Sequence, residues 1–185
     1  LTIYSISYKK IDHFISIGRD MNIVLDLKRD SKSKITFIPY WSNNQTVFPS
    51  NKKDNEIIKN YNLNNKIVYL FAGNLGRVQN LHKLLEILKE VKNDNAVFIF
   101  IGNGANSNLV QKYCNQKNIF YLGEKNYDDQ KIFLNACDIS VISLCEKILG
   151  FGVPSKIYSY LSVGKPVLYF GPNNSEIYMI LNEFK

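Results

Sequence analysis

The sequence predicts an α/β fold, with a Rossmann-like parallel sheet covered by helices on both faces. From residue 66 onward, short apolar runs rich in β-forming residues alternate with helical patterns. These runs are apolar at nearly every position, as in strands buried on both faces, and most of them end at a glycine. The 185 residues suffice for one domain, or for one domain with a piece of another. With 45% apolar and 21% charged residues, the chain does not belong to the disordered class.

Each element expected after residue 66 has its own justification. The run 67–72 is a buried strand closed by Gly73, and the leucines after it recur at helical spacings of three and four. Pro154 suits the first turn of a helix and Gly164 its C-terminal cap, and Ser175 can cap the last helix. In order, we expect strands over 67–72, 96–101, 119–122, 138–144 and 166–170, and helices carrying residues 81–91, 109–113, 128–136, 154–163 and 177–181.

The first 65 residues follow a different pattern. A strand is expected over 13–17, a helix over 20–28 and another strand over 35–39, after which the composition turns polar. Because the chain starts without Met and stops within a helical pattern, we expect a fragment of a longer protein, truncated in its last domain. The expected organisation is the end of a preceding domain over 1–40, an interdomain linker over 41–65 and the main domain over 66–185.

Charge and composition restrict the class of partner. The net charge of +7 suits a phosphate-bearing ligand, nucleic acid or an anionic membrane face, or else reflects a lysine-rich solvated surface. The aromatic residues do not alternate with basic ones, which argues against nucleic acid. The apolar runs are far shorter than the roughly 20 residues that span a bilayer, and no signal-peptide pattern is present. Three cysteines without metal-ligand spacing and two distant histidines indicate buried thiols in a reducing compartment and no metal site.

The candidate site follows from the expected sheet. In parallel α/β sheets, ligands bind at the carboxyl ends of the strands, and glycines in the turns there let backbone amides approach a ligand. The candidate residues in these turns are Gly76, Arg77, Gly102, Asn103, Gly104, Gly123, Glu124, Lys125, Gly152, Val153, Pro154, Ser155 and Lys156.

Two of these turns together favour a diphosphate. The stretch from Gly152 to Lys156 opens a helix, whose free amides and dipole favour an anion. Ser155 adds a hydroxyl and Lys156 a positive charge. Arg77, after the first strand, can fork onto a phosphate from the other side. For each cation the alternative is an ordinary exposed side chain.

Other ligands match the sequence less well. A dinucleotide fingerprint would need a glycine at Ser107, although Glu124 lies about 20 residues on, so NAD stays a minor alternative. There is no GxxxxGK[ST] loop, and without an Asp-x-Asp pair a metal-chelated diphosphate has no obvious ligands. Two histidines do not establish a Ser/His/Asp triad without geometry.

Six short segments in a fixed order carry a resemblance to a known family. They are GNLGR at 73–77, IGNG at 101–104, YLG at 121–123, ACD at 136–138, VPSK at 153–156 and GKPV at 164–167. This succession resembles the nucleotide-sugar-binding domain of the retaining family 4 glycosyltransferases, which have the GT-B fold. The similarity is greatest to members that build bacterial surface polysaccharides such as O-antigen, lipopolysaccharide and capsule. Residues 12–17, Met21 and 38–41 resemble the end of the family's acceptor-binding domain and its linker.

The resemblance implies transfer of a sugar from a nucleotide sugar, a UDP-sugar such as UDP-N-acetylhexosamine, to a glycan or polyprenyl-diphosphate-linked acceptor. It implies that Arg77 and Lys156 neutralise the departing diphosphate without metal or cofactor, since fixed cations there favour the transition state. Backbone amides of Gly152 and Val153 would hold phosphate or sugar oxygens. Gly102, Asn103 and Gly104 would lie beneath the nucleotide, and Gly123, Glu124 and Lys125 beside the base.

Three positions depart from the family pattern. The family often carries two glutamates eight residues apart, where this chain has Phe151 and Ser159. The second glutamate usually binds the ribose hydroxyls, and Ser159 offers only one weaker hydrogen bond. Gln79 stands where a lysine commonly precedes the helix after the glycine turn. Glu146 is a candidate substitute for the first glutamate, against the alternative of a solvated loop residue.

The favoured function is therefore a glycosyltransferase fragment that binds the donor and by itself transfers little or nothing. Two alternatives stay open. One is a non-catalytic nucleotide-sugar-binding module, in which Ser159 marks a lost donor site. The other is a sugar-nucleotide epimerase of the same fold, which would need acidic and histidine groups that this segment does not show. The expected location is the cytoplasm, including the inner face of the cytoplasmic membrane.

Overall fold

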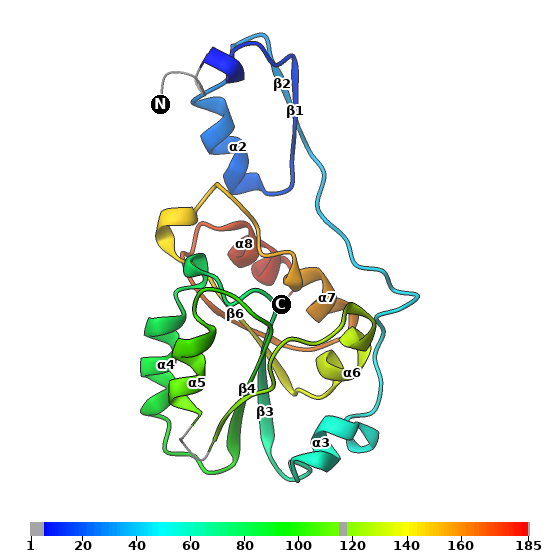
Figure 1. The fold of residues 1–185 in the computed structure, drawn as a ribbon. Coiled ribbons are helices and arrows are strands. Elements are labelled where there is room, and N and C mark those ends of the chain that lie inside the picture. Colours follow the sequence, from blue (N-terminus) through cyan, green and yellow to red (C-terminus); the bar gives the residue numbers. More distant parts are fainter. Residues whose placement is uncertain (1–5, 115–117, 185) are drawn as a thin grey trace. The chain divides into compact units, whose positions relative to one another are not determined.

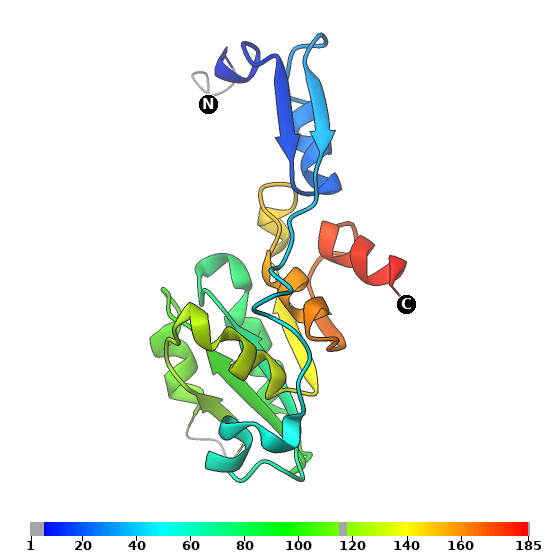
Figure 2. The same cartoon turned by 90° about the vertical axis from the view of Figure 1, so that its right-hand side faces the viewer.

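The structure, a computed structural model, describes residues 6–114 and 118–184. The chain divides into two compact units. The larger unit consists of Trp41–Leu144 and Ser155–Phe170. The smaller unit consists of the described residues up to Tyr40, Cys145–Pro154, and the described residues from Gly171 onward. The course of the chain is shown from two sides in Figures 1 and 2.

The larger unit is built on a five-stranded parallel sheet with the strand order β5-β4-β3-β6-β7. From β3 the chain builds outward through β4 to β5, then returns to the other side of β3 for β6 and β7 (Figure 1). The strand order therefore reverses between β3 and β6, which is a topological switch point. The strands are β3 (Ile67–Ala72), β4 (Ala96–Ile101), β5 (Ile119–Tyr121), β6 (Ile139–Ser143) and β7 (Val167–Phe170).

Helices cover both faces of this sheet, which confirms the predicted fold class. In Figure 1, α4 (Leu81–Lys89) and α5 (Ser107–Tyr113) lie on one face, and α6 (Gln130–Asn135) and α7 (Lys156–Ser162) on the other. The leucines spaced along α4 are all buried, and they pack in one hydrophobic core cluster with apolar side chains of β3 and β4. The predicted helical stripe is thus the surface that α4 buries against the sheet.

The predicted element boundaries agree with the structure to within a few residues. Helix α7 begins at Lys156 with Ser155 as its N-cap residue, two positions later than Pro154 suggested. Gly164 adopts φ +65° directly after the last turn of α7, as predicted for a C-terminal cap. The predicted helix over 128–136 is a 3-10 turn, η3 (Tyr127–Asp129), followed by α6.

The segment expected to be an interdomain linker belongs instead to the larger unit. It contains η1 (Lys52–Asp54) and α3 (Glu56–Asn60). The Asn55 side chain accepts a hydrogen bond from the N–H of Ile57 at 3.0 Å and donates to the carbonyl of Ile132 at 2.7 Å. Asn55 therefore caps α3 and ties it to α6. Four apolar residues of the segment are buried, Val47, Ile57, Ile58 and Leu63, whereas Trp41, Phe48 and Tyr61 are exposed.

The smaller unit begins with a β-α-β arrangement. Strands β1 (His13–Ser16) and β2 (Lys34–Phe37) pair in parallel and are connected through α2 (Arg19–Asp26), close to the predicted bounds. Residues 145–154, with η4 (Glu146–Ile148), and the last helix α8 (Glu176–Glu183) also belong to this unit. The sequence analysis assigned these two segments to the main domain, whereas the division into compact units groups them with the N-terminal segment.

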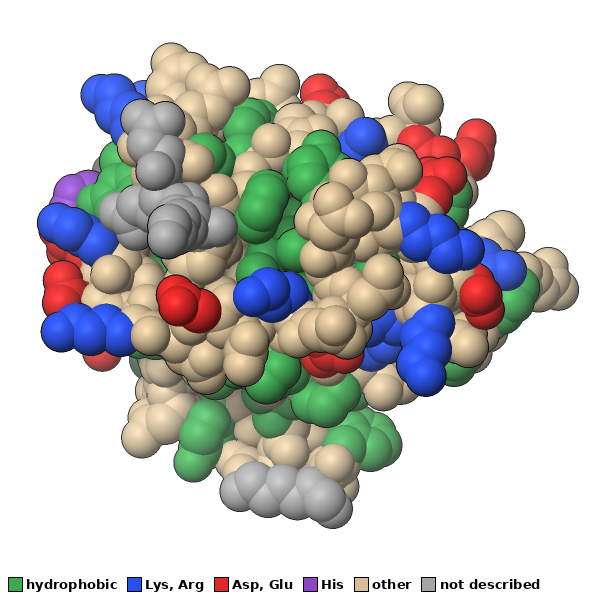
Figure 3. All heavy atoms as spheres, turned by 90° about the horizontal axis from the view of Figure 1, so that it is seen from below, with side chains coloured by type: hydrophobic (Ala, Val, Ile, Leu, Met, Phe, Trp, Pro, Cys, Tyr) green, Lys and Arg blue, Asp and Glu red, His purple; other side chains and the backbone are tan. Residues whose placement is uncertain are grey.

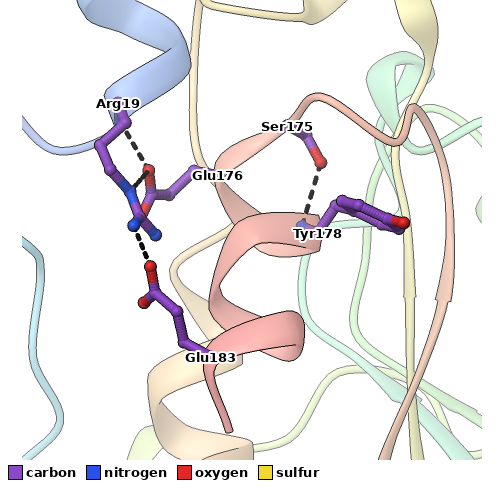
Figure 4. A network of polar contacts seen from close by, with 5 residues as sticks. All are labelled: Arg19, Ser175, Glu176, Tyr178 and Glu183. Atoms are coloured by element: carbon purple, nitrogen blue, oxygen red, sulfur yellow. Dashed lines mark hydrogen bonds and ion pairs between the residues drawn. The ribbon is translucent and has the colours of Figure 1, made fainter. Parts of the chain in front are cut away.

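A charge network connects α2 to α8 within the smaller unit (Figure 4). The buried carboxylate of Glu176 accepts hydrogen bonds from the Arg19 backbone N–H at 2.6 Å, from Nε at 3.0 Å and from Nη2 at 2.9 Å. Glu183 binds the same guanidinium, and the two carboxylates raise the pKa of Arg19. Ser175 accepts a hydrogen bond from the N–H of Tyr178 at 3.3 Å, which confirms it as the predicted cap of the last helix.

The surface shows no sign of a membrane-spanning element in the part of the chain that the structure describes. None of the helices there has both the length and the apolar composition needed to cross a bilayer. On the face drawn in Figure 3, the coloured Lys and Arg side chains are interspersed with Asp and Glu.

Candidate functional site at the carboxyl edge of the sheet

The turns that follow β3, β4 and β5 form one continuous rim. The N–H of Gly73 donates to the carbonyl of Ile101 at 2.9 Å, and that of Leu75 donates to Asn103 at 2.9 Å. The N–H of Gly102 donates to the carbonyl of Gly123 at 2.8 Å. Because the ladder hydrogen bonds continue past the ends of the strands, these turns are held in fixed positions beside one another.

Gly102 and Gly104 are required by contacts between these turns. Gly102 has φ +130°, and an added Cβ would lie 1.9 Å from the carbonyl oxygen of Gly73. At Gly104, with φ +154°, an added Cβ would lie 2.6 Å from Oδ1 of Asn74. The sequence analysis explained these glycines by close approach of a ligand, whereas the structure shows a close approach of the neighbouring turn. By contrast, Gly123, Gly152 and Gly164 have open space where a Cβ would stand.

Lys156 reaches the carboxyl edge of β3 from the start of α7. Its Nζ lies 3.7 Å from the centroid of the Phe71 ring, within the range of a cation–π contact. Gly73 has φ +120°, and an added Cβ would lie 3.3 Å from Cε of Lys156 and 3.4 Å from Nζ. Nζ is buried and has no hydrogen-bond partner among the described residues. Burial alone lowers the pKa of Lys156 to about 7.

Arg77 lies in the same turn region as Gly73. It begins the 3-10 turn η2 (Arg77–Gln79) that leads from the glycine turn into α4, and its side chain is exposed. Both cations predicted to bind a diphosphate therefore lie in the larger unit and adjoin one stretch of chain, residues 73–79. The two environments differ, because Arg77 is exposed whereas the ammonium nitrogen of Lys156 is buried.

The remaining predicted site residues divide between the two units. Glu124 and Lys125 are exposed after β5, and Asn103 accepts hydrogen bonds from Gly104 and Ser107 on the rim. The carbonyl of Gly76 accepts a hydrogen bond from the Asn106 side chain. Gly152, Val153 and Pro154 belong to the smaller unit, whereas Ser155 and Lys156 belong to the larger. Glu146 also belongs to the smaller unit.

Ser159, at the position where the family often has a glutamate, interacts with a residue that the sequence did not single out. Its hydroxyl accepts a hydrogen bond at 3.4 Å from Nε2 of Gln130, the first residue of α6. Oε1 of Gln130 is buried and without a hydrogen-bond partner in the described chain. Nothing in the sequence pattern pointed to Gln130, because the contact joins residues 29 positions apart.

Two further buried polar atoms near the rim were missed by sequence analysis as site features. They are Oε1 of Gln79, at the end of η2, and the hydroxyl of Ser143, the last residue of β6. Neither atom has a hydrogen-bond partner within the described ranges. Buried polar groups are normally paired, and these two atoms are exceptions among the described residues.

Comparison with known proteins identifies the protein family to which this chain belongs. Residues 53–175 match the family Glycosyl transferases group 1. The chain is 33% identical over 184 residues to the probable glycosyltransferase WbjE of Pseudomonas aeruginosa. This alignment covers 98% of the chain and 46% of WbjE. It is 23% identical over 159 residues to the putative colanic acid biosynthesis glycosyl transferase WcaI of Escherichia coli K12, which covers 83% of the chain and 39% of WcaI.

A solved structure of Anabaena HepE in complex with UDP and glucose superimposes with a TM-score of 0.72 at 13% identity, covering 98% of this chain and 56% of HepE. At that identity the likeness shows the fold alone, and it confirms the predicted Rossmann-like half of a GT-B fold. The chain belongs to the glycosyl transferases group 1 family. It spans less than half the length of the curated relatives WbjE and WcaI.

Proposed function

We propose that this chain is the donor-binding part of a retaining glycosyltransferase and that it binds a nucleotide-diphosphate sugar at the carboxyl edge of β3. The observation that carries the proposal is the buried, unpaired amine of Lys156, which lies against Gly73 at the topological switch point of the sheet. In open α/β sheets, the crevice at such a point is where ligands bind. A phosphate oxygen there would provide the partner that Nζ lacks.

The chemistry of glycosyl transfer fits cations at this position. As the bond between the anomeric carbon and the phosphate oxygen breaks, negative charge accumulates on the departing diphosphate. A fixed cation in a buried setting lowers the energy of that charged state more than it lowers the energy of the intact donor. Lys156 is placed to do this from the sheet side, and exposed Arg77 can add a bidentate contact from solvent. We propose that the two cations serve without a metal ion.

The donor and acceptor are proposed from the relatives. HepE was crystallised with UDP and glucose, which favours a UDP-sugar donor, hexose or N-acetylhexosamine. WcaI is described as a colanic acid biosynthesis enzyme, which favours a growing surface polysaccharide, glycan or polyprenyl-diphosphate-linked, as the acceptor. The full protein would then act in the cytoplasm at the inner face of the membrane, where its positive charge favours anionic lipid.

One observation favours a second candidate, a nucleotide-sugar-binding module without turnover. The hydroxyl of Ser159 already accepts a hydrogen bond from Gln130 and carries no negative charge. A serine hydroxyl holds the donor less firmly than a glutamate carboxylate does. A site with the serine would bind the donor without orienting it for transfer. Full-length protein that binds a nucleotide sugar but forms no product with a panel of acceptors would select this candidate.

Thermal unfolding with nucleotides tests the proposed function. UDP or a UDP-sugar at saturating concentration should raise the melting temperature, with equal shifts in Mg²⁺ and in EDTA. Arg77→Ala and Lys156→Met should reduce the shift, and Lys89→Met, which removes a lysine from the end of α4, should leave it intact. Unmoved melting curves with UDP, GDP and their sugars would refute donor binding. Mass spectrometry of products from full-length protein then identifies the sugar and the linkage.

A further inference from the structure

The amine of Lys156 lies in an environment that lacks any charge to balance it. The side chain extends along Gly73, and Nζ rests on the face of Phe71. Desolvation is the sole cause of the lowering of its pKa, to about 7, and no carboxylate among the described residues acts on it. Of the titratable groups nearby, Tyr160 lies one turn along α7 with its hydroxyl bonded to Ala72, and Arg77 lies on the β3 turn.

Two neutral side chains of the rim, Ser143 and Gln79, carry oxygens that can accept a hydrogen bond. Neither oxygen has a hydrogen-bond partner among the described residues. Ser143 is the last residue of β6, which pairs with β3 at Tyr69–Ile139 and Leu70–Ser140. Val141 shares the core cluster of Phe71, and residues two apart in a strand share a face, so Ser143 lies on the Phe71 face.

Gln79 adds a second neutral group at the other end of the same turn. Its side chain is buried, and its Oε1 lacks a partner within the described chain. Gln79 and Ser143 carry no charge, so neither side chain balances a protonated Lys156. Gly73 itself is exposed, so a ligand resting on the glycine turn comes within reach of this buried group.

We infer that the diphosphate of the donor supplies the missing counter-ion of Lys156 and that binding is coupled to the uptake of one proton from solution onto Nζ. The inference rests on the proposed function and specifies how its site operates. In the coupled step, the neutral amine takes a proton from the acid form of the buffer, which becomes its conjugate base. The resulting ammonium pairs with a phosphate oxygen, and no bond of the ligand breaks.

The coupling has a measurable size. With a resting pKa of about 7, roughly 0.9 proton is taken up for each ligand bound at about pH 8, and roughly 0.1 at about pH 6. Affinity should fall about tenfold for each pH unit above about 8 and level off below about 6.5. The terminal phosphate of UDP has a pKa of about 6, so it hardly titrates above about pH 7 and does not obscure the effect.

Titration calorimetry of the chain with UDP tests the inference. At about pH 8 the apparent binding enthalpy should differ between Tris and Hepes, two buffers of different ionisation enthalpy, by an amount that corresponds to nearly one proton taken up. Lys156→Met should remove both the buffer dependence and the pH dependence of the affinity. Lys89→Met should keep both, and Arg77→Gln should weaken binding while keeping the proton uptake, because an arginine does not titrate in this range.

A second measurement covers the case in which Lys156→Met binds UDP too weakly for calorimetry. With lysines labelled at Cε with ¹³C, the free chain should show one signal that titrates near neutral pH and is missing from Lys156→Met. Saturating UDP should move the midpoint of that signal above about pH 9.

The failures of the two ideas are distinguishable. UDP that binds without buffer-dependent heat, or a lysine midpoint that UDP leaves unmoved, overturns the proton coupling while the proposed function stands. Proton uptake that persists unchanged in Lys156→Met likewise overturns the assignment to Lys156. A complete lack of UDP binding removes the proposed function, and the inference with it.

Discussion

Replacing Tyr160 by phenylalanine removes one hydroxyl from the centre of the larger unit. Strands β3 and β6 pair at Tyr69–Ile139 and at Leu70–Ser140. Two residues after Leu70, at Ala72, the hydroxyl of Tyr160 takes the place of the neighbouring strand. It accepts a hydrogen bond from the N–H of Ala72 at 2.9 Å and lies 3.4 Å from the carbonyl oxygen of the same residue. Tyr160 is fully buried and Ala72 nearly so, so no water replaces the lost group.

The expected cost follows from that geometry. Tyr160→Phe leaves a buried backbone N–H without a partner, which destabilises by about 1–3 kcal/mol. For a protein of this size, a loss of about 2 kcal/mol corresponds to a melting temperature lower by about 4–8 °C. The ring itself is retained, so the packing of α7 on the sheet should not change.

Urea unfolding and amide hydrogen exchange measure this effect separately. The free energy of unfolding should fall in Tyr160→Phe, and the Ala72 amide should exchange faster than its neighbours in β3. Tyr127→Phe is the matched control, because it removes a hydroxyl from a side chain that is 71% exposed; its stability should stay within about 0.5 kcal/mol of the parent. If Tyr160→Phe is as stable as Tyr127→Phe and its Ala72 amide stays protected, the hydroxyl does not carry the role assigned to it.

Three further predictions concern the rim, the charge network and Lys156. Gly102→Ala should lower the free energy of unfolding by about 3–5 kcal/mol through strain and collision with Gly73. Gly123→Ala, with open space at its Cβ, should lower it by about 1–2 kcal/mol. Equal losses of this free energy in urea unfolding would contradict the packing argument. Glu176→Gln should lower the stability of the smaller unit by about 1–3 kcal/mol, since Arg19 is partly solvated, and should show a smaller dependence on salt than the parent. Because the pKa of Lys156 is lower in the folded chain, the unfolded chain binds more protons between about pH 7 and pH 10 and the stability of the free chain rises with pH there. Lys156→Met should therefore stabilise the free chain more at pH 7, by about 4 kcal/mol, than at pH 9, by about 2 kcal/mol; an equal gain at both values would show that the amine is solvated.

Much of the fold was predictable from the sequence because its signals are local. The run 96–101 is apolar throughout, and it is a strand with every residue buried. The leucine spacing after residue 81 marked a helix that begins at that residue. By contrast, local signals leave the segment 41–65 open, since its Asn and Lys side chains resemble those of a linker until their partners on α6 and Asp138 are known.

The candidate site was predictable only in part. Arg77 and Lys156 were singled out as cations after strands, and both belong to the unit that holds the sheet. Their roles in donor binding stay predictions. Gln130 and Ser143 had no sequence signal, because a glutamine at a helix start and a serine at a strand end are common. Only their buried, unpaired atoms distinguish them.

The amino-acid sequence by itself determined the alternation of strands and helices, the glycine turns and hence the class of fold, since periodicity and turn chemistry act over a few residues. The tertiary structure alone decided that the amine of Lys156 is buried against Phe71 and that a side chain at Gly102 would collide with Gly73. It also grouped residues 145–154 with the N-terminal segment. Desolvation and close packing depend on groups that are distant along the chain. For that reason the sequence placed Lys156 at the start of a helix, but only the fold shows that its amine is buried.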